Sequence, residues 1–168
     1  MKLRYVFAFV VCWSISVSIH AQSSEPSNTV VFVCEHGAAK SVLAAAYFNK
    51  LAVERHLDVR AVPRGVTPQE DLSASTMRGL KKDGVEIGVS KPQALTNYDI
   101  EHAALVIAFL PLAQEYSKAG EVETWNAPEV SDDYDKARDT IIRNVEQLLS
   151  EFDKRSSAQA HLKGNAHE

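Results

Sequence analysis

Runs of apolar residues alternate with amphipathic segments along most of this chain. Four runs rich in β-branched and aromatic residues predict β-strands, at 29–33, 59–62, 104–110 and 121–125. The first and third runs lack an apolar–polar alternation, which is typical of strands covered on both faces. Three longer segments predict helices, at 42–56, 73–82 and 132–152. In the last of them apolar residues recur every three or four positions, as on the buried face of an amphipathic helix.

This alternation of strands and helices predicts an α/β fold. Strands separated by helices usually pair in parallel, so we expect a doubly wound parallel sheet with helices on both faces. In such sheets ligands bind beyond the carboxyl ends of the strands. The loop that follows the first strand, from Cys34 to Ser41, is therefore expected at the ligand site.

The first 21 residues differ from the rest of the chain. Lys2 and Arg4 precede an apolar stretch of about fifteen residues, and Ala21 supplies a small residue where a signal peptidase would cut. The stretch is shorter than the roughly 20 residues of a membrane-spanning helix. We therefore expect a signal peptide at 1–21 and an exported, periplasmic protein with no membrane association after cleavage. An uncleaved N-terminal anchor is the alternative.

Downstream of the signal the sequence predicts one folded domain, at 29–153. Residues 22–28 are polar and contain Pro26, as in a linker. Residues 154–168 hold one large apolar residue, Leu162, and predict a flexible tail.

Composition limits what this domain binds. The 168 residues include 18 Lys and Arg against 22 Asp and Glu, so the chain lacks the basic excess with which proteins bind nucleic acid. Loss of the signal removes Lys2, Arg4 and Cys12, which leaves 147 of the 168 residues, a net charge of −6 in place of −4, and one cysteine, Cys34. A single cysteine excludes a disulfide scaffold. Because His56 and His102 have no partner at metal-ligand spacing and there is no second cysteine, no metal is expected. Nothing in the sequence indicates a cofactor.

The loop from Cys34 to Ser41 has the composition of an anion-binding site. Its middle residues are Glu35, His36, Gly37, Ala38 and Ala39, followed by Lys40. Backbone N–H groups of a small-residue loop that opens a helix can surround an anion, and their positive field favours a nucleophilic thiolate. Gly37 tolerates a positive φ, and Lys40 adds a positive charge. Ser41 is expected either to cap the helix or to donate a hydrogen bond to the sulfur of Cys34.

A cysteine, five residues, a basic residue and a serine after a buried strand resemble the low-molecular-weight protein tyrosine phosphatase superfamily, which includes thioredoxin-coupled arsenate reductases. The resemblance extends from about Val30 to Phe152, with further similar segments at 61–65, 84–90 and 98–107. It implies a four-stranded parallel sheet flanked by helices. It also implies that Cys34 takes a phosphoryl group from the substrate and returns it to water.

The first departure from the family pattern concerns charge at the loop. The family's loop has Arg where this chain has Lys40, and a flexible point charge cannot replace the bidentate guanidinium. We expect transition-state stabilisation to be weaker by about 1–3 kcal/mol, the scale of one charge-assisted hydrogen bond. Glu35 further weakens the attraction for an anion unless its side chain points outward, and a protonated His36 would offset it.

The second departure concerns the general acid. The family uses an Asp followed by Pro on the loop after the last strand. Aligning on Pro128 puts Ala127 at that position and removes the acid, whereas aligning on Trp125 puts Glu129 there. We favour Glu129, because a glutamate can make the same proton transfer. The neighbouring Asp132 and Asp133 are expected to cap the last helix instead.

Arsenate reduction coupled to thioredoxin needs further cysteines to resolve the nucleophile through a disulfide. The chain without its signal has none, which argues against that mechanism. Three aromatic residues are predicted either to border the cleft, where they would stack on a phenolic substrate, or to pack in the core: Tyr116, Trp125 and Tyr134. Arg60 and Arg64 flank the second strand, and for them we favour a surface role over a substrate clamp.

The favoured hypothesis is an exported phosphatase that hydrolyses phosphate monoesters of the phosphotyrosine type through Cys34, with Lys40 and Glu129 as the other catalytic residues. The ligand would be a phosphate ester or an inorganic oxyanion held by residues 35–41, and a protein substrate is compatible with this site. The first alternative is a non-catalytic domain that binds an oxyanion or a partner. A thiol-redox role for Cys34 is a third, less favoured hypothesis.

Overall fold

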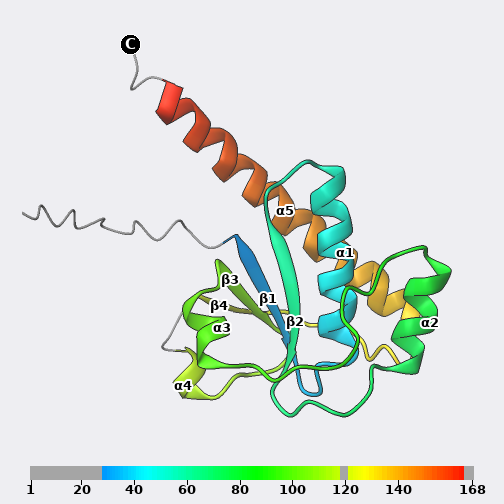
Figure 1. Ribbon diagram of the computed structural model, residues 1–168. Coiled ribbons are helices and arrows are strands. Elements are labelled where there is room, and N and C mark those ends of the chain that lie inside the picture. The colour runs from blue at the N-terminus through cyan, green and yellow to red at the C-terminus, as the bar shows by residue number, and fades with distance from the viewer. Residues whose placement is uncertain (1–27, 118–120, 165–168) are drawn as a thin grey trace, which may run out of the picture.

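A computed structural model describes residues 28–117 and 121–164. The elements are β1 (Thr29–Cys34), α1 (Lys40–Glu54), β2 (Arg60–Gly65), α2 (Ala74–Lys82), α3 (Asn97–Glu101), β3 (Leu105–Ala108), α4 (Gln114–Ser117), β4 (Val122–Thr124) and α5 (Tyr134–Gly164). The four strands form one parallel sheet in the order β2-β1-β3-β4. The predicted four-stranded parallel α/β fold is thus confirmed (Figure 1).

The central strand β1 separates two hydrophobic layers. Because successive side chains of a strand point to opposite faces, Val30 and Phe32 enter one layer and Val31 and Val33 enter the other. The first layer contains the apolar faces of α1 and α5, and the second contains Ile100 of α3. β1 and β3 are covered on both faces, which explains their uninterrupted apolar sequences.

Parallel pairing brings the ends of three strands to one edge of the sheet. Cys34 at the end of β1 is in register with Gly65 at the end of β2, and Val33 is in register with Ala108 of β3. The loops after these strands therefore meet at the same edge, where the sequence placed the ligand site (Figure 1).

The helix prediction needs correction at the end of the chain and for two short helices. The last helix was expected to end near Phe152, with a tail at 154–168, but α5 continues to Gly164. Residues 154–163 contain no Pro or Gly, and several are good helix formers, so nothing ends the helix earlier. The short helices α3 and α4 were not predicted. A capping box, in which Thr96 and Asp99 bond to each other's backbone N–H groups, opens α3.

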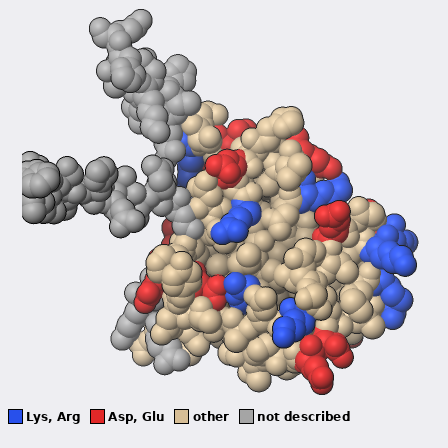
Figure 2. Space-filling view, viewed as in Figure 1, with Lys and Arg blue, Asp and Glu red and all other residues tan. Residues whose placement is uncertain are grey.

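The predicted signal peptide at 1–21 lies outside the described residues, as does the linker apart from Asn28. No helix in the described ranges is both long enough and apolar enough to cross a membrane. On the face shown in Figure 2, Lys and Arg side chains lie interspersed with Asp and Glu, without an extended basic patch.

Candidate active site

The thiol of Cys34 is placed by the end of β1 and the start of α1. Only 5% of the residue is exposed, and its Sγ lies 3.1 Å from Oγ of Ser41, which is fully buried in the first turn of α1. The predicted contact between Ser41 and the sulfur is confirmed, whereas Ser41 does not cap the helix. A hydroxyl that donates to sulfur stabilises the thiolate, which is the nucleophilic form.

The carbonyl groups of the loop are turned toward the segment after β2. Four backbone N–H groups of that segment donate hydrogen bonds to loop carbonyls at 2.8–3.3 Å: Val66 to Cys34, Thr67 to Glu35, Gln69 to His36 and Ser73 to Ala38. Since the described peptide bonds are all trans, the N–H that follows each carbonyl points to the opposite side. Nothing in the described chain accepts a hydrogen bond from the backbone N–H groups of residues 35–39. These donors are free to bind an anion, next to the positive end of α1.

Two glycines allow the loop to lie against the end of β2. Gly37 has a φ of 63°, as predicted from its place in the loop. A Cβ on Gly37 would lie 2.8 Å from the backbone N of Gly65, and a Cβ on Gly65 would lie 2.6 Å from the N of Gly37. Any larger residue at either position would push the loop away from β2 and disturb the orientation of its N–H groups.

Lys40 and Glu129 form an ion pair at the mouth of the loop, with Nζ and Oε1 2.5 Å apart. The side chain of Lys40 is 15% exposed and that of Glu129 is 60% exposed. The lysine is therefore held close to the loop, whereas the glutamate reaches it from the solvent side. In this arrangement Glu129 neutralises the charge that an anion in the loop would use.

Glu129 is held in place by the turn that leads into α5. The next residue, Val130, is 1% exposed and packs in the core. The carbonyl of Glu129 accepts hydrogen bonds from the N–H groups of Asp132 and Asp133, both at 3.2 Å. The Asp133 carboxylate accepts from the N–H of Lys136 at 2.9 Å, so Asp133 caps α5 as predicted, whereas the Asp132 carboxylate accepts from the hydroxyl of Ser131 instead. The backbone on the C-terminal side of Glu129 is thus fixed.

Cys34, Lys40 and Glu129 line one cavity of about 410 Å³. Glu35, His36, Ala38 and Ala39 also line it, as do Gln69 and Ser73 from the segment after β2. The cavity therefore brings together all the candidate site residues except Gly37 and Ser41. Gly37 shapes the loop, and Ser41 contacts the sulfur of Cys34. Ala127, the residue at the acid position in the other alignment, packs against the core instead.

His36 and Glu35 occupy different environments in this loop. The Nδ1 atom of His36 lies 3.2 Å from the carbonyl oxygen of Thr67, so the imidazole bonds to the neighbouring segment. Glu35 is exposed, and its carboxylate has no hydrogen bond or ion pair within the described part of the chain. The cavity thus carries two acidic residues, of which only Glu129 is neutralised.

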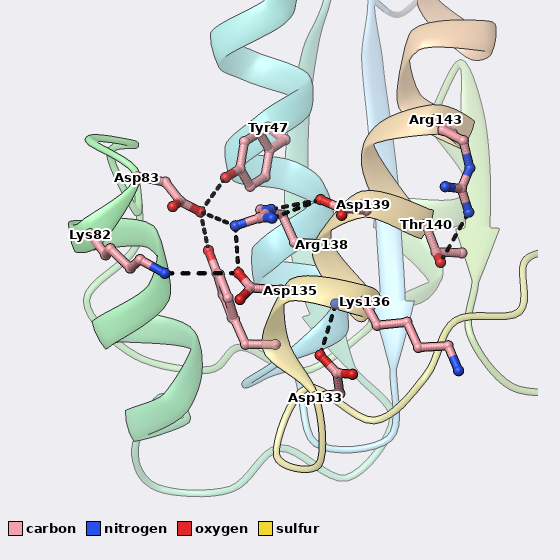
Figure 3. Close-up of polar contacts among 11 residues, drawn as sticks. Tyr47, Lys82, Asp83, Asp133, Asp135, Lys136, Arg138, Asp139, Thr140 and Arg143 are labelled. Atoms are coloured by element: carbon pink, nitrogen blue, oxygen red, sulfur yellow. Dashed lines mark hydrogen bonds and ion pairs between the residues drawn. The ribbon is translucent and has the colours of Figure 1, made fainter.

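A polar cluster between α1, α2 and α5 was not predicted from the sequence (Figure 3). Asp83 accepts hydrogen bonds from the hydroxyls of Tyr47 at 2.7 Å and Tyr134 at 2.8 Å, and Arg138 lies 3.5 Å from the same carboxylate oxygen. Burial opposes ionisation of Asp83, but the two hydroxyls and the guanidinium lower its pKa overall. Burial and the bond to Asp83 raise the pKa of both tyrosines, so they remain hydrogen-bond donors.

The cluster fastens the beginning of α5 to α2. Tyr134 is the first residue of α5, and its ring lies so close to Gly79 that a Cβ there would be 2.0 Å from the ring atom Cε2. Because Tyr134 follows the turn that carries Glu129, its bond to Asp83 limits how far that turn can move. Sequence spacing gave no signal for this contact between segments that are far apart in the chain.

Arg60 and Arg64 contact other protein groups. Arg60 Nε donates to the hydroxyl of Thr29 at 3.0 Å. Arg64 forms an ion pair with Asp99 at 2.8 Å, with both side chains largely buried. Burial opposes ionisation of Asp99, but hydrogen bonds from Arg64 and Thr96 lower its pKa. Neither arginine lines the cavity at Cys34.

None of the three aromatic residues considered for substrate stacking lines this cavity. Trp125 packs against Phe32 with ring centroids 5.6 Å apart. Tyr134 bonds to Asp83, and Tyr116 packs against the second hydrophobic layer. In the described ranges, no group of three or more His, Cys, Asp and Glu residues is arranged to hold a metal ion.

We compared the sequence and the fold of this chain with those of known proteins. No protein-family model matches the sequence, and no curated protein is significantly similar to it. Solved structures do match. The arginine phosphatase YwlE of Bacillus subtilis, as a cysteine-to-serine mutant with a phosphorylated active-site serine, matches with a TM-score of 0.66 and 20% identity over 75% of this chain and 96% of that chain.

Two further structures extend the comparison. A low-molecular-weight protein tyrosine phosphatase from Bacillus subtilis matches with a TM-score of 0.65 and 20% identity, over 75% of this chain and 97% of the other. An arsenate reductase from Archaeoglobus fulgidus matches with a TM-score of 0.58 and 23% identity, over 72% of this chain and 98% of the other. The chain therefore has the fold that low-molecular-weight protein tyrosine phosphatases share with arsenate reductases.

Proposed function

We propose that the protein hydrolyses phosphate monoesters through a cysteinyl-phosphate at Cys34. One observation carries the proposal: the thiol lies next to unpartnered backbone N–H groups, in the same cavity as the Lys40 ammonium group and the Glu129 carboxylate. The N–H groups and Lys40 would hold the non-reacting phosphoryl oxygens, where negative charge is stabilised most during transfer. The solved structures with this fold include phosphatases, which supports a hydrolase.

In the first step, the Cys34 thiolate attacks phosphorus. The S–P bond forms while the bond from phosphorus to the leaving oxygen breaks. The phosphoryl group replaces Glu129 as the counter-ion of Lys40. The released Glu129 carboxylate takes up a proton from solvent and gives it to the leaving oxygen. The products are a free alcohol, a cysteinyl-phosphate and an ionised Glu129.

In the second step, water attacks the phosphorus of the cysteinyl-phosphate. Glu129 takes one proton from the water as the O–P bond forms and the S–P bond breaks. Inorganic phosphate leaves, and the Cys34 thiolate is regenerated, with Ser41 in position to donate a hydrogen bond to it. Glu129 returns this proton to solvent as its ion pair with Lys40 forms again, so the protein regains its starting state and no oxidant, reductant or metal is consumed.

The test is hydrolysis of p-nitrophenyl phosphate by the purified protein. Replacing the nucleophile in Cys34→Ala and Cys34→Ser should abolish release of p-nitrophenol, and circular dichroism should confirm that both variants are folded. If either folded variant releases p-nitrophenol as fast as the unmodified protein, Cys34 is not the nucleophile.

The Lys40–Glu129 ion pair favours one second candidate, a domain that binds oxyanions or a partner without turnover. Lysine in place of the family's arginine weakens transition-state stabilisation, and its charge is already neutralised by Glu129. Calorimetry with phosphate and arsenate distinguishes the two candidates. Binding with no turnover, even in Lys40→Arg, supports the binding domain, whereas turnover gained in Lys40→Arg supports a weakened enzyme.

We also propose that the protein is exported to the periplasm. The charged start, short apolar stretch and Ala21 of the sequence support the proposal. Expression of the full chain, followed by fractionation and N-terminal sequencing, tests it. A mature N-terminus at Gln22 in the periplasmic fraction is expected, and an intact Met1 in the cytoplasmic fraction would contradict it.

A further inference from the structure

Among the residues that the structure describes, none gives the cavity at Cys34 an aromatic wall. A phenyl ring next to a bound phosphoryl group needs flat apolar surfaces on which to stack. Within the described part of the chain, no Phe, Tyr or Trp is among the residues that line the cavity. Apart from Cys34 and the loop alanines, Val130 is the apolar residue there.

The two aromatic residues nearest to Glu129 in the sequence, Trp125 and Tyr134, are held away from the cavity by other contacts. Trp125 is fixed between Phe32 and Phe109, whose ring centroids lie 5.6 and 6.3 Å from its own. Tyr134 is fixed by its hydrogen bond to Asp83 and by its contact with Gly79. Moving either ring to the cavity would break core packing, so the absence of an aromatic wall is a property of the fold.

The polar side chains of the cavity are already largely occupied, except for Glu35. Ser73 Oγ accepts a hydrogen bond from the N–H of Thr76, and the side chain of Gln69 donates to the carbonyl of Asp71. Glu129 is paired with Lys40. The carboxylate of Glu35 has no such partner in the described chain.

The charges in the cavity indicate that Glu35 lacks a cationic partner. A bound phosphoryl group would use the charge of Lys40 and the loop N–H groups. Glu35 lines the same cavity and directly follows the nucleophile, so its negative charge would then lie close to that of the anion. Like charges repel, so binding is more favourable when a cation lies between them. No Lys or Arg other than Lys40 lines the cavity in the described residues, and Nδ1 of His36 is bonded to the carbonyl of Thr67. An ammonium group on the substrate would supply the cation that Glu35 lacks.

We propose that the substrate is a small aliphatic phosphate monoester with an ammonium group close to its phosphate, and that Glu35 binds this ammonium group. The inference rests on the proposed phosphatase function and specifies its substrate class. Phosphorylated amino alcohols have this chemistry. Aryl phosphates lack the cation and would find no ring to stack on. A cavity of about 410 Å³ is at the small end of ligand sites, as expected for such a compound.

Binding to the Cys34→Ala variant tests the proposal without interference from the different reactivities of the esters. Calorimetry would compare the affinities of three esters. Phosphoethanolamine carries an ammonium group, glycerol 3-phosphate carries hydroxyl groups, and phenyl phosphate carries an aromatic ring. We expect phosphoethanolamine to bind about fivefold more tightly than glycerol 3-phosphate, the scale of one partly exposed ion pair. Phenyl phosphate should bind no more tightly than glycerol 3-phosphate.

Adding Glu35→Gln to the same variant should remove the fivefold preference and leave the binding of glycerol 3-phosphate unchanged or slightly tighter. Glu54→Gln, on the exposed end of α1, is the matched control and should keep the preference. Tighter binding of phenyl phosphate than of phosphoethanolamine would overturn the proposal, as would a preference that survives Glu35→Gln. If the unmodified protein hydrolyses no ester, the proposed function fails; if it hydrolyses esters but the binding order is reversed, only the substrate class is wrong.

Discussion

The carboxylate of Glu129 lies 2.5 Å from the ammonium nitrogen of Lys40, although the two residues are 89 positions apart in the chain. The cation of the site thus has a counter-ion before any substrate arrives. An incoming phosphoryl group has to take over that role, and in doing so it frees Glu129. Anion binding and availability of the proposed acid are therefore linked through one ion pair.

Removing the charge of Glu129 should separate these two effects. In Glu129→Gln, inorganic phosphate no longer competes with a carboxylate for Lys40, so we expect about fivefold tighter binding. The variant cannot transfer a proton, so kcat for an alkyl phosphate should fall by about 10²- to 10⁴-fold. Calorimetry and steady-state kinetics measure the two quantities. Glu54→Gln, which breaks the Lys50–Glu54 pair on the same helix as Lys40, should change neither. Weaker phosphate binding in Glu129→Gln would show that the glutamate is not a competing counter-ion.

Lys40 should respond differently to arginine and to methionine. A guanidinium can bind two phosphoryl oxygens at once, so Lys40→Arg should raise kcat/KM for a phosphate ester by about tenfold or more, whereas Lys40→Met should lower it. Steady-state kinetics with one ester measure both changes. Lys50→Met, on the exposed part of α1, serves as the control and should have no effect. An unchanged kcat/KM in both Lys40 variants would exclude a role for this side chain in phosphoryl transfer.

Gly79 should be essential for the packing of α2 against α5. In an exposed helix, Gly→Ala stabilises by about 1 kcal/mol, but here the new Cβ would lie 2.0 Å from the ring of Tyr134. We therefore expect Gly79→Ala to lower the free energy of unfolding by about 1–3 kcal/mol, as overpacking does. Urea denaturation measures the change. In a Tyr134→Ala background the clash is absent, so the same substitution should become neutral or stabilising. Destabilisation that persists in that background would contradict the packing argument.

Asp83 should make stability depend on acid pH. Although burial opposes it, the hydroxyls of Tyr47 and Tyr134 and the charge of Arg138 lower the pKa of Asp83 below its usual 3.8. A carboxylate with a lowered pKa stabilises the fold above its unfolded-state pKa, and this stabilisation is lost as the pH falls through the lower folded-state value. Asp83→Asn should therefore reduce the free energy of unfolding at pH 7, by about 1–3 kcal/mol for bonds to a charged group.

The measurement for Asp83 is urea denaturation of both proteins between pH 7 and pH 2. The difference between them should be full at neutral pH and shrink as the pH falls below about 4, near the ordinary pKa of an Asp. Asp153→Asn, at an exposed position of α5, is the matched control and should have no effect at either pH. A difference that stays constant down to pH 2 would show that the charge of Asp83 does not stabilise the cluster.

Local sequence patterns were sufficient to predict the main elements of the fold. The uninterrupted apolar runs of β1 and β3 reflect burial on both faces, and the periodicity of α5 reflects its packing against the sheet. The helices α3 and α4 were missed because four or five residues do not show a helical period. The end of α5 was misplaced because loss of apolar residues ends burial but does not end a helix.

The candidate site was predictable in its loop but not in its long-range contacts. Cys34, Gly37 and Ser41 could be assigned because a strand, a small-residue loop and a helix are contiguous in the sequence. Sequence left two positions open for the acid, because Pro128 and Trp125 suggested different alignments. The placement of Glu129 beside Lys40 depends on the turn around the buried Val130, and local spacing carries no information on such a contact.

The most direct test of the central claim is to trap the intermediate on Cys34. The protein would be mixed with an aryl phosphate, quenched in acid within milliseconds to seconds, and digested for mass spectrometry, with Cys34→Ala treated in parallel. The proposed mechanism predicts a single phosphoryl group on the peptide that contains Cys34, which disappears as the substrate is exhausted and is absent from the variant. Hydrolysis of the ester with no phosphoryl group on Cys34 at any time, or equal hydrolysis by Cys34→Ala, would contradict it.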